Sequence, residues 1–347
     1  MDSSIKKIRV KSIRQETPEA KTFFLEYTDN TPISYQAGQF LTLIFPKAHG
    51  AEARRSYSFC TTPGIDPVPA ITVKRIPNGE FSRPLIDHAQ PGDEFLTIGA
   101  SGYFNVPDDL TPFQQIIFLA AGSGITPIYA LIKLILAKPA GPKVTLIYSN
   151  HAEADTVYYK ALCDLEAAQA DRFTIEFLFS TSTDISKGRL SKGLLEKLLV
   201  KHVHGPIHKV LFYLCGPFDY MRMATIVLKT EGVLPAHIRK ENFSTVKPRI
   251  VLEPPDKDAH TISLTLRGKH YNFVSQHPES ILQSAKRLGI GIPYSCESGQ
   301  CGTCAATCKT GSVWMSNNEV LTDGELAKRR VLTCTGFAVG GDVELEV

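Results

Sequence analysis

The cysteines are the residues whose spacing most directly suggests chemistry in this sequence. Of eight cysteines, four fall within thirteen positions, at Cys296, Cys301, Cys304 and Cys308. Disulfide frameworks are typical of small secreted domains, whereas this chain has 347 residues and shows no apolar signal segment near Met1. In a reducing compartment, crowded thiols usually bind metal. The sequence therefore predicts a metal centre in its last quarter.

The spacing of the cysteines indicates which kind of centre this is. Cys296, Cys301 and Cys304 follow the pattern C-x4-C-x2-C, and Cys334 is expected on a later strand. This pattern resembles plant-type ferredoxin, in which four thiolates hold a 2Fe–2S cluster. The two glycines of the loop allow the backbone conformations that a tight curl needs. A structural zinc site usually takes two separated C-x2-C pairs, and only one is present. We expect these four cysteines to be the cluster ligands.

Cys308 leaves an alternative open. Cys301, Cys304 and Cys308 also read as C-x2-C-x3-C, which is part of the bacterial 4Fe–4S run. The proline that follows that run is absent after Cys308, and no further closely spaced cysteine completes it. We interpret Cys308 as a core-facing strand residue.

Two motifs near the N-terminus point to a flavin. Arg55-Ser56-Tyr57-Ser58 follows a predicted strand, and Val73-Lys74-Arg75 precedes Gly79-Glu80-Phe81-Ser82, where Ser82 is expected to open a short helix. A glycine and a hydroxyl at a helix N-terminus suit a pyrophosphate. In this order the motifs resemble the flavin domain of the ferredoxin–NADP reductase superfamily.

The resemblance implies a role for several of these residues. Arg55 would pair with a phosphate, Tyr57 would stack on the isoalloxazine, and Ser58 would hydrogen-bond near flavin N5. Holding of the pyrophosphate by Gly79 and Ser82 favours FAD, although one branch of the superfamily uses FMN. The full set expected at the flavin is Arg55, Ser56, Tyr57, Ser58, Lys74, Gly79, Phe81 and Ser82.

A second pair of motifs suggests a nicotinamide nucleotide. Gly122-Ser123-Gly124-Ile125-Thr126-Pro127 follows an apolar strand, with Thr126 expected as the helix N-cap and Pro127 at its first position. Two glycines alone also suit an ordinary tight turn between strand and helix, and they do not make the dinucleotide fingerprint G-x-G-x-x-G. The segment does resemble the superfamily's pyrophosphate loop.

Cys215-Gly216-Pro217 ends a later apolar strand and resembles the superfamily motif beside the nicotinamide. The resemblance implies that Cys215 positions the nucleotide rather than acting as a redox thiol. Glu241-Asn242-Phe243 corresponds to an E-x-F-like segment that relatives carry near the flavin, and the sequence leaves the role of Glu241 open. The choice between NADH and NADPH also stays open, with a lean to NADPH, because no carboxylate ends the strand at Tyr148–His151.

The elements that must position these motifs fall into three groups. Short strands separated by turns predict an antiparallel β-barrel over residues 1–106, and alternating apolar strands and helices predict a parallel-sheet α/β domain over 107–244. A proline-rich linker is expected at 245–258, followed by an α+β, β-grasp-like ferredoxin domain at 259–347. This last domain is expected to open with a hairpin of Thr261–Leu266 and Tyr271–Val274. The expected strands of the first two domains are Ile5–Ile13, Thr22–Tyr27, Phe40–Phe45, Ala70–Arg75, Glu94–Ile98, Gln115–Ala121, Lys143–Ser149, Phe173–Ser180 and Lys209–Cys215. The expected helices there are Pro127–Leu136, Thr156–Ala168, Ser191–Lys201 and Phe218–Gly232.

Composition excludes several classes of function. With 38 Lys and Arg against 35 Asp and Glu, the net charge of +3 is too even for a nucleic-acid-binding surface. The apolar runs are too short to span a bilayer, so a cytoplasmic protein without an integral membrane segment is expected. The ferredoxin-like segment carries eight basic and eight acidic residues, unlike the acidic free ferredoxins. A tethered module needs less electrostatic steering because its linker supplies a high effective concentration.

Taken in order, the flavin, nicotinamide and 2Fe–2S motifs resemble oxygenase reductase components that carry a C-terminal ferredoxin. The phenylacetyl-CoA epoxidase reductase subunit and the ketosteroid hydroxylase reductases have this layout. The resemblance implies electron transfer from NADPH or NADH through FAD to a 2Fe–2S cluster and on to an oxygenase, hydroxylase or desaturase component, with a phenylacetyl-CoA epoxidase-like system favoured. The alternatives are a reductase of a separate ferredoxin or flavodoxin, and a redox-sensing binding protein.

Overall fold

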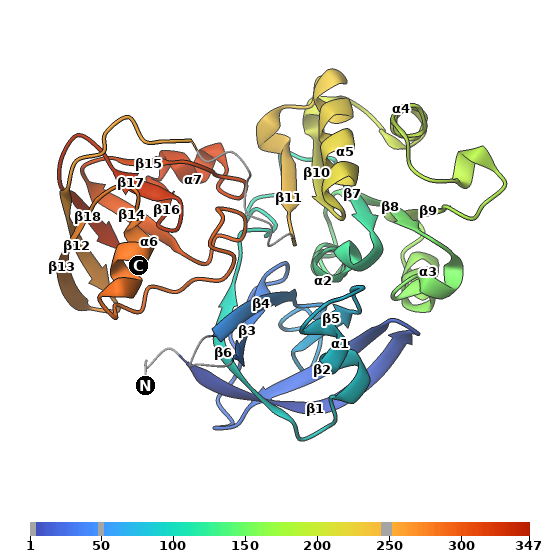
Figure 1. The fold of residues 1–347 in the computed structure, drawn as a ribbon. Coiled ribbons are helices and arrows are strands. Elements are labelled where there is room, and N and C mark those ends of the chain that lie inside the picture. The colour runs from blue at the N-terminus through green and yellow to red at the C-terminus, as the bar shows by residue number, and fades with distance from the viewer. Residues whose placement is uncertain (1–4, 48–51, 244–251) are drawn as a thin grey trace. The chain divides into compact units, whose positions relative to one another are not determined.

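The computed structural model describes residues 5–47, 52–243 and 252–347. The described residues form two compact units, of which one comprises 5–47 and 52–242 and the other 243 and 252–347 (Figure 1). Of the linker expected at 245–258, residues 245–251 lie outside the described residues.

The first unit begins with a six-stranded antiparallel sheet in the order β4-β3-β6-β1-β2-β5. Its strands are β1 (Lys6–Thr17), β2 (Ala20–Tyr27), β3 (Phe40–Pro46), β4 (Glu52–Ser58), β5 (Ala70–Lys74) and β6 (Glu94–Ser101), with helix α1 (Ser82–His88) between β5 and β6. An antiparallel bridge between Phe59 and Ile71 joins the two ends of this order. The sheet therefore closes into the expected barrel. Strand β4 is missing from the expected strands because its arginines break the apolar alternation that marks a strand.

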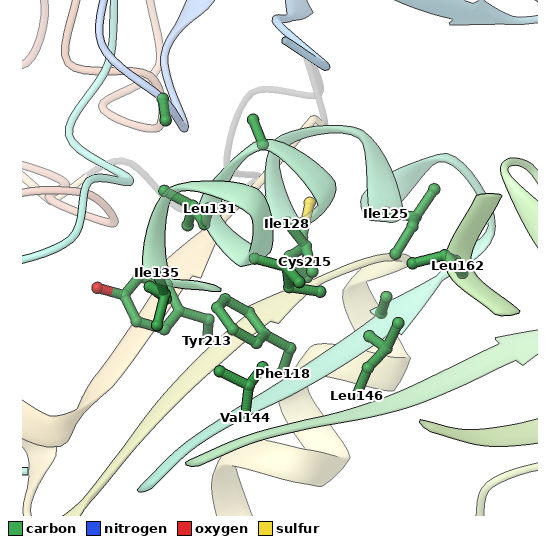
Figure 2. Close-up of a cluster of buried hydrophobic side chains, with 14 of the residues drawn as sticks. Phe118, Ile125, Ile128, Leu131, Ile135, Val144, Leu146, Leu162, Tyr213 and Cys215 are labelled. Carbon is green, nitrogen blue, oxygen red and sulfur yellow. The ribbon is translucent and has the colours of Figure 1, made fainter. Parts of the chain in front are cut away.

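The same unit continues with a five-stranded parallel sheet in the order β11-β10-β7-β8-β9. Its elements are β7 (Gln115–Ala121), α2 (Ile125–Leu136), β8 (Lys143–Asn150), α3 (Tyr159–Ala168), β9 (Phe173–Phe179), α4 (Lys192–His202), β10 (Val210–Cys215), α5 (Phe218–Thr230) and β11 (Ile238–Glu241). Side chains of a strand alternate between faces: Ile116 and Phe118 of β7 pack with α2 and α3, whereas Ile117 and Leu119 pack with α4 and α5. Figure 2 shows the first of these clusters. Helices cover both faces of the sheet, as buried parallel strands require.

The barrel and the parallel sheet share a core. Ala20, Cys60 and Ala70 of the barrel belong to the hydrophobic cluster that α2 covers. The hydroxyl of Thr62 donates to the carbonyl of Ala130 on α2 at 2.8 Å. Continuous packing of this kind fixes the two sheets relative to each other.

The second unit holds a five-stranded mixed sheet, in the order β13-β12-β18-β14-β16, and the two-stranded sheet β15-β17. Its elements are β12 (His260–Leu266), β13 (Lys269–Ser275), α6 (Ile281–Arg287), β14 (Ala305–Thr310), β15 (Val313–Met315), α7 (Asp323–Ala327), β16 (Arg330–Leu332), β17 (Gly336–Ala338) and β18 (Val343–Glu346). Helix α6 begins with a capping box between Ser280 and Gln283 and buries Ile281 and Leu282. The expected hairpin is confirmed as β12 and β13.

None of the helices among the described residues has the length and apolar character needed to cross a membrane.

Candidate functional site

The flavin motif lies on β4, on the barrel strand that pairs with β3. Leu43 is opposite Arg55 and Leu41 is opposite Tyr57 in the antiparallel register. Arg55 and Tyr57 are two residues apart and therefore share a face, while Ser58 is buried on the other, with 3% of its surface exposed. Burial raises the pKa of the Tyr57 hydroxyl, so the ring stays neutral.

Arg55 reaches the start of α1. Its guanidinium lies 4.7 Å from the centre of the Phe81 ring, a cation–π distance. Phe81 is the residue before α1, no side chain caps the helix, and its first turn carries no acidic residue. Guanidinium and uncapped backbone N–H groups together offer a phosphate the donors it requires.

Gly79 and Ser82 pack directly against each other beside this position. A Cβ on Gly79 would lie 2.3 Å from the Ser82 Oγ, closer than atoms can approach, so the turn requires glycine. The buried Ser82 hydroxyl accepts a hydrogen bond from the backbone N–H of Ile76 at 3.1 Å. Ser82 opens α1 as expected, and its side chain supports the turn that precedes the helix.

The nucleotide motifs lie at the carboxyl ends of two neighbouring parallel strands, β7 and β10. Ala120 pairs with Cys215, so the loops after both strands meet. A Cβ on Gly124 would lie 2.1 Å from the carbonyl oxygen of Cys215, and one on Gly216 would lie 2.9 Å from the Ala121 Cβ. At this edge of the sheet the backbones of the two loops come so close that neither position has room for a side chain. Dinucleotides bind at such an edge in α/β folds.

The start of α2 differs from the expectation. The helix begins at Ile125, with Gly124 as its N-cap, so Thr126 and Pro127 lie inside its first turn. The Thr126 hydroxyl donates to the carbonyl of Ser123 at 2.9 Å instead of capping the helix. The short 3-10 turn over Gly122–Gly124, in which Gly122 has a φ of 55°, leads straight into the helix and advances its start. The loop remains next to Lys74 of β5, whose Nζ would lie 3.7 Å from a Cβ on Gly122.

A buried acid joins the flavin and nucleotide motifs. The Ser58 hydroxyl donates to the Glu241 carboxylate at 3.2 Å, and Glu241 pairs with Cys215 across β11 and β10. Burial raises the pKa of Glu241 to about 8, and the hydrogen bond from Ser58 offsets part of the rise. Burial, followed by the charge of Glu241, raises the pKa of the Cys215 thiol well above its usual range, so the thiol is protonated. The sequence leaves the role of Glu241 open, and its E-x-F-like segment is the one feature of the sequence that points to a place near the flavin.

The four cysteines expected to bind the cluster come together in the second unit. The thiols of Cys301 and Cys334 donate to Cys296 and hold its pKa well below its usual range. Side-chain and backbone contacts with Cys334 also lower the pKa of Cys304. Cys334 lies in the turn between β16 and β17 rather than on a strand, and this turn brings it to the loop.

The loop geometry suits iron and sulfide. Gly299 has a φ of 75°, and a Cβ there would lie 2.6 Å from the Asn317 carbonyl, so glycine is required. The backbone N–H of Ser298 points at the Cys296 Sγ at 3.4 Å, a donor of the kind that tunes iron–sulfur centres. Among the described residues, no three His, Cys, Asp or Glu side chains are placed so that they could bind one metal ion. A 2Fe–2S cluster needs only two thiolates per iron.

Cys308 stands apart from these four. It lies on β14, is 3% exposed, and its thiol donates to the carbonyl of Thr310 at 3.3 Å. Its interpretation as a core-facing strand residue agrees with the structure.

Comparison with known proteins gives the same three parts. Models of an oxidoreductase FAD-binding domain, an oxidoreductase NAD-binding domain and a 2Fe-2S iron-sulfur cluster binding domain match residues 7–106, 118–225 and 264–339. The chain is 30% identical to the ferredoxin reductase component of a 3-ketosteroid-9-alpha-monooxygenase from Mycobacterium tuberculosis, over 97% of this chain and 94% of that protein. The chain belongs to the family of oxygenase reductase components.

One further relative agrees with this family, and one solved structure shares the fold. One subunit of the 1,2-phenylacetyl-CoA epoxidase of Escherichia coli is 30% identical over 98% of this chain and 96% of its own. The structure of phthalate dioxygenase reductase matches with a TM-score of 0.60 at 22% identity, over 99% of this chain and 98% of that one. The reductase is thus an oxidoreductase with FAD, a nicotinamide nucleotide and a 2Fe–2S cluster as its cofactors.

Proposed function

We propose that the reductase delivers electrons from NADPH or NADH to an oxygenase component, with its own 2Fe–2S cluster as the last carrier in the chain. The flavin accepts two electrons as a hydride and the cluster accepts one at a time, which is the chemistry these groups supply when bound. The observation that carries the proposal is the convergence of Ser58, Glu241 and Cys215 where the barrel meets the parallel sheet. There a side-chain hydrogen bond joins the flavin motif to the strand that pairs with the nucleotide motif.

On the flavin side of this site, we assign a separate role to each of a few residues. Arg55 and the first turn of α1 would hold the phosphates, with Gly79, Phe81 and Ser82 shaping the turn, while Tyr57 would cover the ring system. Ser56 and Lys74 complete the set proposed for the cofactor. The Ser58 hydroxyl would act at the flavin atom that receives the hydride.

The nucleotide side would use the two facing loops. Gly122 and Gly124, with Thr126 and Pro127 behind them, would let the backbone approach the pyrophosphate. The loop of Cys215, Gly216 and Pro217 would hold the nicotinamide, and the neutral Cys215 thiol would act by contact and not as a nucleophile.

Glu241 can hold a proton at neutral pH, because burial raises its pKa to about 8. A buried neutral acid bonded to Ser58 can donate or accept a proton next to the reacting atoms without placing a full charge there. We propose that Glu241 sets the proton supply of the Ser58 hydroxyl.

The second unit would carry the cluster on Cys296, Cys301, Cys304 and Cys334, and pass electrons outward. We propose three domains, at 1–106, 107–244 and 259–347, with a linker at 245–258 between the second and the third. The proposed location of the reductase is the cytoplasm. Its acceptor would be an oxygenase, hydroxylase or desaturase component, and we propose a phenylacetyl-CoA epoxidase-like system as the first to test, supported by 30% identity over nearly the whole chain.

The test of this proposal is reconstitution of the reductase with a purified oxygenase component. The oxygenase components of phenylacetyl-CoA epoxidase and of 3-ketosteroid-9-alpha-monooxygenase are each supplied with NADPH or NADH and the reductase, and product is measured per nucleotide oxidised. The proposal expects product with at least one of them, and none with the Cys301→Ser variant. If Cys301→Ser still reduced a separate ferredoxin or flavodoxin at the wild-type rate, this would favour the alternative that the protein is the reductase of such a free carrier. Absence of steady-state reduction of cytochrome c would favour a redox-sensing protein.

A further inference from the structure

A chain of buried hydroxyl groups links the barrel to the nucleotide-binding sheet. The Tyr158 hydroxyl is hydrogen-bonded to the Thr72 Oγ1 on β5, and Thr72 is bonded to Thr22 on β2 at 2.6 Å. Thr22 donates to the Glu16 carboxylate at 2.6 Å. A carboxylate can only accept, so the single proton of each hydroxyl fixes the direction: Tyr158 donates to Thr72, and Thr72 donates to Thr22. All three hydroxyl-bearing residues are buried.

The backbone of Tyr158 is held in an unusual conformation to make this contact. Its φ of 62° and ψ of 20° place it in the left-handed region, immediately before α3. Residues with a Cβ enter this region at a cost in free energy, and such outliers gather at functional sites. The Tyr158 ring is 3% exposed and stacks on Tyr129 with ring centres 4.6 Å apart. A residue with a strained backbone therefore carries the hydroxyl that contacts the barrel.

A second set of contacts leads from Tyr158 to the nucleotide loop. Tyr148 is a buried residue of β8. Its hydroxyl lies 3.0 Å from the carbonyl oxygen of Gly122 and 3.4 Å from that of Val157, the residue before Tyr158. Gly122 in turn lies next to Lys74 of β5. Lys74 is two residues after Thr72, so both side chains are on one face of the strand.

These contacts close into a ring that starts and ends on β5. From Thr72 it passes to Tyr158, then through Val157 to Tyr148, to the Gly122 loop, and back to β5 at Lys74. These contacts connect the loop proposed for the pyrophosphate to β5, the barrel strand that precedes Gly79 and Ser82. A packed interior transmits such constraints because its elements cannot deform freely.

We propose that Tyr158 is a positioning residue for hydride transfer: its hydroxyl bond to Thr72 sets the placement of the nucleotide loop relative to the flavin domain. This rests on the proposed function of the reductase. Hydride transfer requires the reacting atoms at near-contact distance, and a misplacement of about 1 Å can cost up to about 100-fold in rate. The hydroxyl of this tyrosine contacts Thr72 and Cys60 and its ring stacks on Tyr129, and none of these residues belongs to the cofactor motifs. Removal of the hydroxyl should therefore alter the rate of transfer more than the affinity for nucleotide.

The experiment uses Tyr158→Phe in the FAD-loaded protein, with Tyr129→Phe as the matched control. Both variants keep their rings and the stack between them, and only Tyr158 loses a hydroxyl bonded to the barrel. Anaerobic stopped-flow measurement of flavin bleaching against nucleotide concentration gives the limiting rate and the apparent Kd separately. We expect Tyr158→Phe to lower the limiting rate about tenfold with Kd within about twofold of wild type, and Tyr129→Phe to change neither. An unchanged limiting rate in Tyr158→Phe would overturn the proposal, as would an equal loss in Tyr129→Phe.

Thr72→Val removes the other partner of the same bond with little change in shape. If the pair acts as one unit, the Tyr158→Phe/Thr72→Val double variant should be no slower than the slower single variant. Multiplied effects would contradict a shared role. The long-wavelength charge-transfer band of the nucleotide–flavin complex gives an independent readout and should weaken in Tyr158→Phe at saturating nucleotide. Flavin that is not bleached by nucleotide in the wild type would defeat the proposed function itself, an outcome distinct from any change confined to the variants.

Discussion

Replacement of Glu241 by glutamine should make the reductase more stable at neutral and alkaline pH. The pKa of Glu241 rises from 4.5 to about 8 because the side chain is buried, 8% exposed. Between these two pH values the folded protein keeps a proton that the unfolded chain releases, so stability falls as the pH rises. A pKa difference of one between the folded and unfolded states corresponds to about 1.36 kcal/mol. The cost of Glu241 is therefore about 3 kcal/mol at pH 7 and levels off near about 5 kcal/mol above pH 8.

Glutamine keeps the shape of the side chain and an oxygen for the Ser58 hydroxyl, and it does not titrate. Urea unfolding of the FAD-loaded protein should give free energies for wild type and Glu241→Gln that differ by less than about 1 kcal/mol near pH 5. The variant should then gain about 3 kcal/mol over wild type at pH 7. Glu94→Gln is the control: Glu94 is bonded to Arg9, which lowers its pKa, so its titration lies below this range. A constant difference between Glu241→Gln and wild type from pH 5 to pH 9 would refute the assignment of a buried, protonated acid.

Three further variants test the remaining parts of the site. Cys301→Ser should lose or cripple the cluster yet keep flavin reduction by nucleotide, because thiolates are the preferred ligands of iron–sulfur centres; loss of flavin reduction as well, in the anaerobic visible spectrum, would contradict separate modules. Ser58→Ala should slow flavin bleaching roughly 10- to 1000-fold, the scale of one positioned hydrogen bond in a reacting site, and an unchanged stopped-flow rate would show that Ser58 does not reach the flavin. Gly124→Ala should abolish tight nucleotide binding or destabilise the fold, since the new Cβ would lie 2.1 Å from the Cys215 carbonyl. Gly193→Ala is the control, because nothing lies within 4 Å of its new Cβ, and it should stabilise the protein by about 0.5–1 kcal/mol. Equal nucleotide titrations for the two glycine variants would contradict the close approach of the loops.

The parts of the fold that periodicity controls are those the sequence predicts well. The buried strand Gln115–Ala121 is a continuous apolar run and matches β7 residue for residue. The cysteine spacing carries similar information, because the ligands of one cluster must lie together whatever surrounds them. Strand β4 is not predicted, since Arg54 and Arg55 give it no apolar alternation and its pairing with β3 forms it instead.

The features that could not be predicted depend on contacts between distant segments. Glutamate is almost never fully buried unless it is paired, and only the pairing of β11 with β10 places Glu241 beside Cys215 and under Ser58. The left-handed backbone of Tyr158 has no sequence signal, because tyrosine is not a residue that favours it. The start of α2 is set by the 3-10 turn before it, a detail of geometry that the hydroxyl of Thr126 and the ring of Pro127 do not reveal.

The most direct test of electron transfer from the nucleotide through the flavin to the cluster is an anaerobic visible spectrum of the purified reductase before and after addition of NADPH, and then of NADH. We expect flavin bands with 2Fe–2S shoulders that bleach together, and the nucleotide that bleaches them faster is the preferred donor. Bleaching of the flavin with an unchanged cluster spectrum would contradict electron transfer from the flavin to the cluster.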